Sequence, residues 1–233
     1  HRAHARPGES DVIDMVRLVR TSADQLPEGE IARQAQRLGL SRPAKEIQPA
    51  LDIFCHQTRR VHDHRVAFAE AAEADASTLL VLEANCLLVE DAASRLHRLI
   101  AALDEVDWTV LHLGLMMALP SGVADAGNAT LLPAEQNVGA FANLYNARAI
   151  DELLEMLPGE PARLGNYVGD LAPSDPARAS YLSEDDRGAL EATVARCEDR
   201  FVAHPMVATT PALLPYQSPA IRDHFGLVEV QRA

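Results

Sequence analysis

The sequence predicts an α/β fold with a single domain and a mostly parallel central sheet flanked by helices. Short apolar runs typical of buried strands alternate along the chain with stretches that have helical spacing, and the connections between them are short. The 233 residues, 48% of them hydrophobic, suffice for one substantial core. We expect the domain over residues 12–222, a disordered or tag-like start over residues 1–11 and a tail over residues 223–233.

The first third of the chain alternates between the two element types. Residues 12–19 (VIDMVRLV) are apolar and β-branched and predict a strand, and the helix expected over residues 28–38 would end at Gly39. A second short strand is expected at residues 44–48. Apolar residues at helical spacing then predict a long helix over residues 51–74.

The middle of the chain contains the clearest buried strand. Residues 78–82 form a continuous apolar run, as expected for a strand inside a parallel sheet, and the run ends at Glu83, Ala84 and Asn85. The elements expected after it are a short apolar run at residues 86–89, a helix over residues 91–103 and a strand over residues 108–113 closed by Gly114.

The last part of the chain is predicted less regularly. A Gly- and Asp-containing loop over residues 120–128 is expected to precede two strands, at residues 129–132 and 139–145. A helix over residues 147–157 and a polar Pro-containing region to about Tyr181 follow. The capping-box-like Ser183 and Asp186 predict the start of another helix, and the last expected strand covers residues 201–208.

Composition excludes several classes of protein. The net charge of −13 argues against a protein that mainly grips nucleic acid or an anionic membrane, because either needs a cationic face. No stretch approaches the ~18 consecutive apolar residues of a transmembrane helix. Three separated cysteines without a CxxC pair indicate neither a disulfide framework nor a thiolate zinc site, so we expect a cytoplasmic protein.

Known nucleotide and hydrolase motifs are missing from the sequence. It has no GxGxxG or GxxxxGK[ST] loop and no GxSxG segment. P-loop hydrolysis of nucleotides and α/β-hydrolase chemistry therefore have no support.

Three segments in a characteristic order resemble glycosyltransferase family 25, the lipooligosaccharide-type galactosyltransferases. In that family an apolar strand ends in Glu-Asp-Asp, and a helix and an Asp-Trp-Asp-like strand ending in Leu-Gly follow. The corresponding residues here are Glu83-Ala84-Asn85, Asp107-Trp108-Thr109 and Leu113-Gly114. Upstream, Cys55 and Asp63-His64 are similar to the family's Cys and Ser-His pair, without the serine; downstream, GAFANLYNARAIDELLEML from Gly139 and the ending RFVAHPMVATT, with residues 218–221, resemble its closing segments.

This resemblance implies a GT-A-like fold and transfer of a hexose from a nucleotide sugar to a glycan or small hydroxylated acceptor. The usual donor in the family is a UDP-sugar. The resemblance also implies a divalent cation, Mn²⁺ or Mg²⁺, held against the two phosphates by the acidic trio. In this chain Ala84 has no ligand atom and Asn85 lacks the charge, so Glu83 and Asn85 are the remaining candidate metal ligands and the cation would be weakly held or absent.

Two interpretations of the altered trio stay open. In the first, Glu83 and Asn85 contact a ribose or a weakly held metal, or Arg59 and Arg60 neutralise the pyrophosphate, with His64 and Gly139 also lining the nucleotide site. In the second, Glu83 only ends a strand and the site has decayed. An active hexosyltransferase and a catalytically degenerate binding or scaffolding module are accordingly both candidate functions.

The histidines around His64 could suggest a transition-metal site, but their spacing argues against it. On a helix His62 and His64 point about 200° apart, whereas His56, Arg60 and His64 share one face. We therefore expect a solvated or cleft-lining face.

The inverting transfer implied by the family needs a base for the acceptor hydroxyl. Asp170 is the first candidate and Glu135, on the preceding loop, the second; the alternative for Asp170 is a turn before Pro173. His112 and His204 lie in apolar strands and are expected to be core histidines, and Trp108 a core residue. We expect any substrate pocket beside Glu83 and Asn85, facing the loop before Gly139 and the segment around Asp170.

Overall fold

A computed structural model describes the central part of the chain. The described residues are 13–20, 33, 35–40, 43–48, 50, 53, 55–84, 86–114, 130–134, 139–171 and 188–210. The predictions for Asn85, Glu135, the start at residues 1–11, the loop at residues 120–128, Ser183, Asp186 and the tail fall outside these residues.

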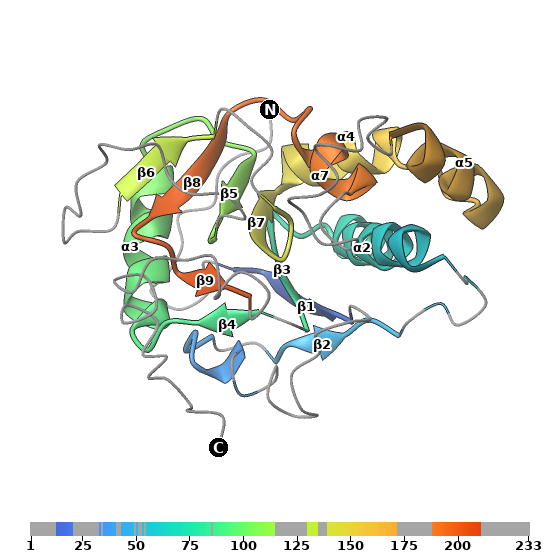
Figure 1. The fold of residues 1–233 in the computed structure, drawn as a ribbon. Coiled ribbons are helices and arrows are strands. Elements are labelled where there is room, and N and C mark those ends of the chain that lie inside the picture. The colour runs from blue at the N-terminus through green and yellow to red at the C-terminus, as the bar shows by residue number, and fades with distance from the viewer. Residues whose placement is uncertain are drawn as a thin grey trace, which may run out of the picture.

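A seven-stranded sheet forms the centre of the molecule, in the order β2-β1-β3-β7-β5-β8-β6 (Figure 1). Its strands are β1 (Met15–Val19), β2 (Lys45–Glu46), β3 (Thr78–Glu83), β5 (Val110–His112), β6 (Thr130–Pro133), β7 (Ala142–Asn146) and β8 (Arg200–His204). Strands β1, β2 and β3 pair in parallel, as do β5 and β8. Strand β7 lies antiparallel between β3 and β5, and β6 is antiparallel to β8. The predicted α/β fold with a mostly parallel sheet is confirmed, with β6 and β7 as the two reversed strands.

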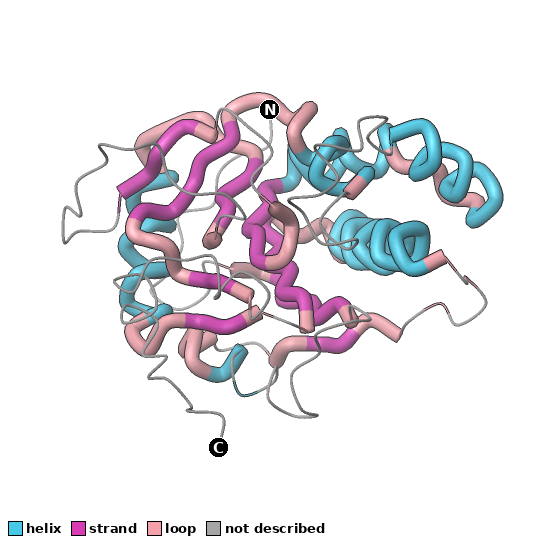
Figure 2. The backbone as a smooth tube through the Cα atoms, viewed as in Figure 1, coloured by secondary structure: helices cyan, strands magenta, loops and turns pink. Residues whose placement is uncertain are grey.

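Helices cover both faces of this sheet (Figure 2). They are α2 (His56–Glu73), α3 (Ala92–Leu103), α4 (Ala147–Met156), α5 (Pro161–Leu171) and α7 (Ala189–Val194). Buried side chains of α2, α4, α5 and α7 form one core with the odd-numbered residues of β3, whereas α3 packs with the even-numbered ones on the opposite face. A small two-stranded sheet, β4 (Leu87–Leu88) with β9 (Ala208–Thr209), lies beside the main one.

Most predicted elements occur at their predicted places, and the differences have local causes. The long helix begins at His56 rather than at residue 51. The helix expected from Ser183 would begin outside the described residues, and α7 follows at Ala189–Val194. The predicted polar region after Pro158 contains α5, which the sequence interpretation missed. Proline is tolerated at the first helical position, and Leu164 and Val168, four residues apart, are buried.

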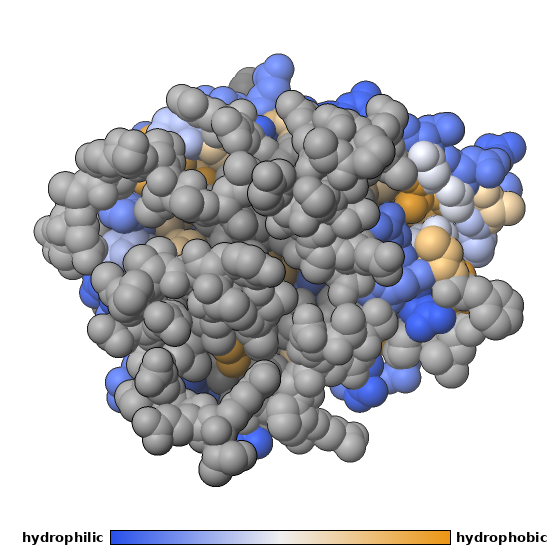
Figure 3. Space-filling view, in the orientation of Figure 1, coloured by the Kyte–Doolittle hydropathy of each residue, from blue (hydrophilic) through white to orange (hydrophobic). Residues whose placement is uncertain are grey.

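The described surface is mainly polar. In Figure 3, hydrophilic side chains dominate the coloured surface, with a few hydrophobic ones between them. Among the described residues, Val106 is the exposed large hydrophobic side chain. Within the same residues, no helix combines the length and the apolar character that crossing a bilayer requires.

Candidate functional site

Glu83 ends β3 and points to the face of the sheet that α2 covers. Side chains alternate along a strand, so Glu83 follows Leu79 and Val81, which both pack in the α2 core. Its N–H donates to the carbonyl of Phe141 at 2.7 Å, just before β7. The carboxylate is therefore held at the carboxyl edge of the sheet but on its buried side, with 2% of the residue exposed.

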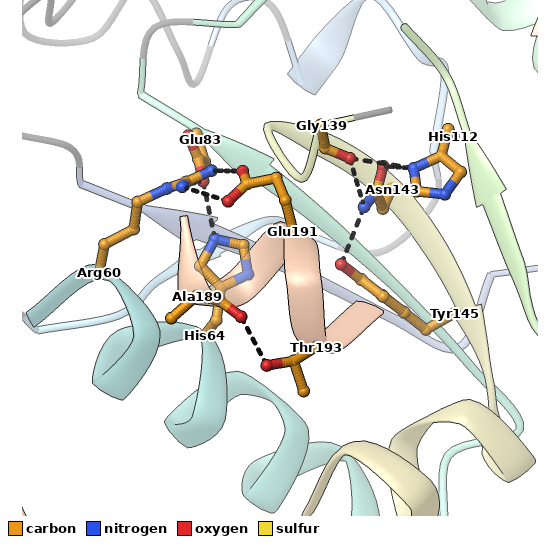
Figure 4. A network of polar contacts seen from close by, with 10 residues as sticks. All are labelled: Arg60, His64, Glu83, His112, Gly139, Asn143, Tyr145, Ala189, Glu191 and Thr193. Atoms are coloured by element: carbon orange, nitrogen blue, oxygen red, sulfur yellow. Dashed lines mark hydrogen bonds and ion pairs between the residues drawn. The ribbon is translucent and has the colours of Figure 1, made fainter. Parts of the chain in front are cut away.

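Arg60 of α2 joins Glu83 to a second buried carboxylate (Figure 4). Its Nε donates to Oε1 of Glu83 at 2.7 Å. Its Nη2 and Nη1 donate to Oε1 and Oε2 of Glu191 at 2.6 Å and 3.1 Å, which is a bidentate pair. All three side chains are buried, so α2, β3 and α7 are tied together by charges that are not screened by water.

His64 adds a second donor to Glu83 (Figure 4). Its Nε2 lies 2.9 Å from Oε1 of Glu83, and an ionised carboxylate only accepts, so Nε2 carries the proton. Arg60 and His64 are one helical turn apart, and the predicted shared face of these two residues is confirmed. The expectation that this face is solvated is wrong, because both side chains are buried against Glu83. Nδ1 of His64 is buried and has no hydrogen-bond partner.

The electrostatics of this charged network, Arg60, His64, Glu83 and Glu191, favour the ionised state of Glu83. Burial alone would raise the pKa of the Glu83 carboxyl, but the Arg60 guanidinium and the His64 donor outweigh burial and lower the pKa to about 2. Burial likewise opposes the charge of Arg60, and the two glutamates more than compensate and raise its pKa. The Glu83 carboxylate and the Arg60 guanidinium thus favour each other's charged form.

Gly188 makes room for the glutamate of α7. It is the N-cap residue of that helix, and a Cβ placed on it would lie 1.7 Å from Oε2 of Glu191 and 3.1 Å from Nη1 of Arg60. Any side chain here would push the Glu191 carboxylate away from Arg60. The network therefore depends on a glycine as well as on its charges.

A second, neutral network lies at the same edge and consists of His112, Gly139, Asn143 and Tyr145 (Figure 4). Nδ1 of His112 lies 3.0 Å from the carbonyl of Gly139 and 3.0 Å from Oδ1 of Asn143. Nδ2 of Asn143 donates to the Tyr145 hydroxyl at 3.0 Å and to the Gly139 carbonyl at 3.3 Å. Gly139 has a φ of 94°, a conformation that side chains disfavour, and this turns its carbonyl toward the network.

His112 is held in its uncharged form. Burial, together with the positive charge of Arg200, lowers the pKa of the imidazole to about 3, against the opposing effect of its hydrogen bonds to Gly139 and Asn143. Its Nε2 is buried and has no partner. The predicted burial of His112 is confirmed, and the same holds for His204; Trp108 is partly buried and packs against the core.

The structure brings together some of the predicted site residues and separates others. Glu83, Arg60 and His64 are in contact, and Gly139 lies at the same sheet edge. Arg59, predicted to neutralise a pyrophosphate, instead donates from Nε and Nη2 to the carbonyl of Ile53 at 2.9 Å and 2.5 Å. Asp170, the first candidate for the base and alternatively a turn residue, is exposed near the C-terminal end of helix α5.

The described residues do not fit the divalent cation that the family resemblance implies. Glu83 already accepts from two donors, one of them a guanidinium, and Ala84 offers no ligand atom. No group of three or more His, Cys, Asp or Glu side chains in the described ranges is arranged to hold a metal ion. A cation at Oε1 of Glu83 would have to displace Arg60, which would leave the guanidinium buried against only one carboxylate.

Sequence reasoning missed Glu191, Asn143 and Tyr145. Glu191 belongs to a short helix far along the chain from Glu83, and nothing in its neighbourhood signals a buried carboxylate. Asn143 carried a usable signal, because a polar residue between Ala142 and Leu144 in a buried strand needs a partner on the next strand.

Comparison with known proteins identifies no family. No protein-family model matches the chain, and no curated protein does. Among solved structures, it is similar to mannose-1-phosphate geranyltransferase from Thermus thermophilus, with 13% identity and a TM-score of 0.42 over 82% of this chain and 73% of that one. It is also similar to a glycosyltransferase involved in the glycosylation of the major capsid of PBCV-1, with 12% identity and a TM-score of 0.38 over 92% of this chain and all of that one. At these values, function has to be inferred from the side chains of the chain itself.

Proposed function

We propose that this chain is a glycosyltransferase-like protein that binds a nucleotide sugar without a divalent cation at Glu83. One observation carries the metal-independence: the cation that faces Glu83 is the Arg60 guanidinium, at 2.7 Å, with both side chains buried. The nucleotide sugar itself comes from the resemblance of the segment around Glu83 to glycosyltransferase family 25.

The charges of the network support this proposal. A hard cation such as Mn²⁺ needs anionic oxygen ligands, and the one ionised ligand of the altered trio is already neutralised. In this proposal Glu83 is not a metal ligand. It has a structural role, in which it fixes α2 against the carboxyl edge of β3. The UDP-sugar would then be held by the polar groups at that edge, and the hydroxylated acceptor would lie next to it.

A second candidate function is a non-catalytic binding or scaffolding module with the same fold. The observation that favours it is the saturation of Glu83 and Arg60 by each other, His64 and Glu191, which leaves the acidic residue of the motif without a role in turnover. Such a module would bind no nucleotide sugar, or would bind one without transferring it.

Isothermal titration of the full chain with UDP, UDP-glucose and UDP-galactose, in EDTA and in Mn²⁺, tests the proposal. We expect binding of at least one UDP-sugar in EDTA, with a dissociation constant that Mn²⁺ leaves unchanged. Binding that requires Mn²⁺ would contradict metal independence, and no binding in either buffer would select the scaffolding module.

A double variant provides the matched control. Ala84→Asp with Asn85→Asp restores the acidic trio and should create Mn²⁺ affinity that the natural chain lacks. If the natural chain already binds Mn²⁺ as tightly as this variant, the altered trio is a working metal site and the proposal is wrong. Release of UDP above the buffer control in the natural chain would exclude the non-catalytic module.

A further inference from the structure

The neutral network contains one buried ring nitrogen that makes no hydrogen bond. His112 makes both of its hydrogen bonds through Nδ1, to Gly139 and Asn143 at 3.0 Å each. Nε2, on the other side of the ring, is buried without a hydrogen-bond partner. Buried polar atoms are nearly always paired, so this exception requires an explanation.

The tautomer of His112 follows from its neighbours. The Asn143 amide is oriented by its Nδ2, which donates to the Tyr145 hydroxyl and to the Gly139 carbonyl, so its Oδ1 faces His112. Both atoms that face Nδ1 are therefore acceptors, and Nδ1 must carry the proton. Nε2 is left with a lone pair and acts as a hydrogen-bond acceptor.

The position of His112 matches that of a ligand group. His112 pairs with Asn143 across β5 and β7, and Asn143 pairs with Val81 across β7 and β3. These side chains lie in one row on the α2 face, and Glu83 stands two residues further along β3. Two strand spacings, about 10 Å, separate β3 from β5. The carboxyl edge of such a sheet is the usual place for a ligand.

We propose that Nε2 of His112 accepts a hydrogen bond from a neutral hydroxyl group of a sugar ligand bound at the carboxyl end of β5. The donor is neutral rather than cationic because the positive charge of Arg200 acts on the same imidazole and opposes a second cation there. Asn143 and Gly139 are positioning residues, since they hold the ring and its tautomer without reaching the ligand. This inference rests on the proposed function for the choice of a sugar as the ligand, whereas the unpaired acceptor itself is an observation independent of it.

A purely structural role explains His112 less well. A phenylalanine would fill a similar volume between β5 and the α2 core without burying an unpaired acceptor. The retained imidazole gives the edge a polar atom with a fixed direction and a fixed protonation state. Such preorganised acceptors distinguish a ligand that has a hydroxyl from one that lacks it.

Long-range ¹H–¹⁵N correlation spectra of the histidine rings in the ¹⁵N-labelled full chain test the proposal. The probes are UDP-glucose, free glucose and free galactose, each added to the highest concentration the protein tolerates. We expect at least one of them to shift Nε2 of His112 upfield, as for a nitrogen that becomes a hydrogen-bond acceptor, while its Nδ1 stays protonated. The other ring nitrogens serve as internal controls for a change of pH.

The outcomes separate this inference from the proposed function. A shift with a free hexose, but no UDP-glucose binding in calorimetry, would support the His112 site and reject the nucleotide sugar. UDP-glucose binding in calorimetry without any change at His112 would overturn the inference and leave the proposed function standing. If none of the three probes moves Nε2, the inference is wrong.

Two variants give a second readout with whichever probe binds. His112→Phe should weaken its binding about tenfold, because one hydrogen bond to the ligand is lost. His97→Gln, exposed on α3 over the opposite face of the sheet, is the control and should bind like the parent. Equal affinity of His112→Phe and the parent would overturn the inference, and the spectra of the parent decide it if the variant does not fold.

Discussion

The charged network around Glu83 and the neutral network around His112 share one face of the sheet but differ in how their polar atoms are satisfied. In the charged network the guanidinium of Arg60 is matched by the carboxylates of Glu83 and Glu191, and Nδ1 of His64 is the buried atom without a partner. In the neutral network Asn143 and Gly139 satisfy one side of an imidazole and leave the other side without a partner. The ion pairs of the first network join α2, β3 and α7, whereas the second network is uncharged and contains the acceptor that we propose binds a ligand.

The largest expected effect comes from breaking the charged network at its centre. Arg60→Met keeps an unbranched side chain that reaches about as far as Nε but leaves Glu83 and Glu191 buried without a cation, which should lower the free energy of unfolding by about 3–5 kcal/mol. Arg59→Met, one residue away, loses only bonds to the Ile53 carbonyl and should cost about 1 kcal/mol. Urea unfolding of both variants measures the difference. Equal losses would mean that the network contributes nothing specific.

A substitution at Gly188 disturbs the same network sterically, without changing its charges. Gly188→Ala puts a methyl group 1.7 Å from the Glu191 carboxylate oxygen and should destabilise the protein by about 1–3 kcal/mol. Gly169→Ala is the control: on α5 its Cβ would meet nothing within 4 Å, so it should stabilise the helix by about 0.5–1 kcal/mol. Thermal unfolding should therefore shift in opposite directions, and a shift of the same sign would contradict the packing described.

The pH dependence of the free energy of unfolding tests the charge of Glu83. Its pKa is lowered from 4.5 to about 2 in the folded protein, so the ionised group stabilises the fold above pH 4.5, and this stabilisation is lost as the pH falls toward 2. Glu83→Gln lacks that contribution. The difference in unfolding free energy between the parent and Glu83→Gln should be largest near neutral pH, about 7, and shrink below 4.5. A difference that stays constant down to pH 2 would show that the charge of Glu83 is not involved.

The smallest expected effect concerns the neutral network. Tyr145→Phe removes one acceptor of Asn143, whose Nδ2 keeps the Gly139 carbonyl, and should cost about 1 kcal/mol. The ring itself stays packed edge-on against Phe68, with centroids 5.0 Å apart. Chemical denaturation measures this change. A loss of unfolding free energy as large as that of Arg60→Met would mean that the neutral network contributes as much to stability as the charged one.

The sequence predicted the parts of the site that depend on periodicity. The apolar run before Glu83 predicted β3, and helical spacing predicted that Arg60 and His64 share a face. It could not predict that Glu83 would be neutralised, because the partner Glu191 is distant in sequence and enters through a short helix. The tautomer of His112 was equally hidden, since it depends on Asn143 across the strand and on the backbone of Gly139. Contacts between distant segments leave no local pattern.

The resemblance to glycosyltransferase family 25 implied a metal chemistry that the described residues around Glu83 do not fit. It directed attention to the carboxyl end of β3, where the charged network lies. The implied cation does not fit there, because Arg60 takes the position opposite the carboxylate. The absence of a carboxylate at Ala84 was visible in the sequence, and the burial of the Arg60 guanidinium beside Glu83 was not.

The most direct test of metal independence is the electron paramagnetic resonance of Mn²⁺ in the presence of UDP-glucose. The signal of the free aqua ion is measured with the parent and with Glu83→Gln at equal protein concentration. We predict the same free Mn²⁺ in both samples, because Glu83 is bound to Arg60 and His64 and contributes no ligand. A larger loss of the free signal with the parent, absent in Glu83→Gln, would show that Glu83 holds the cation and would contradict the account.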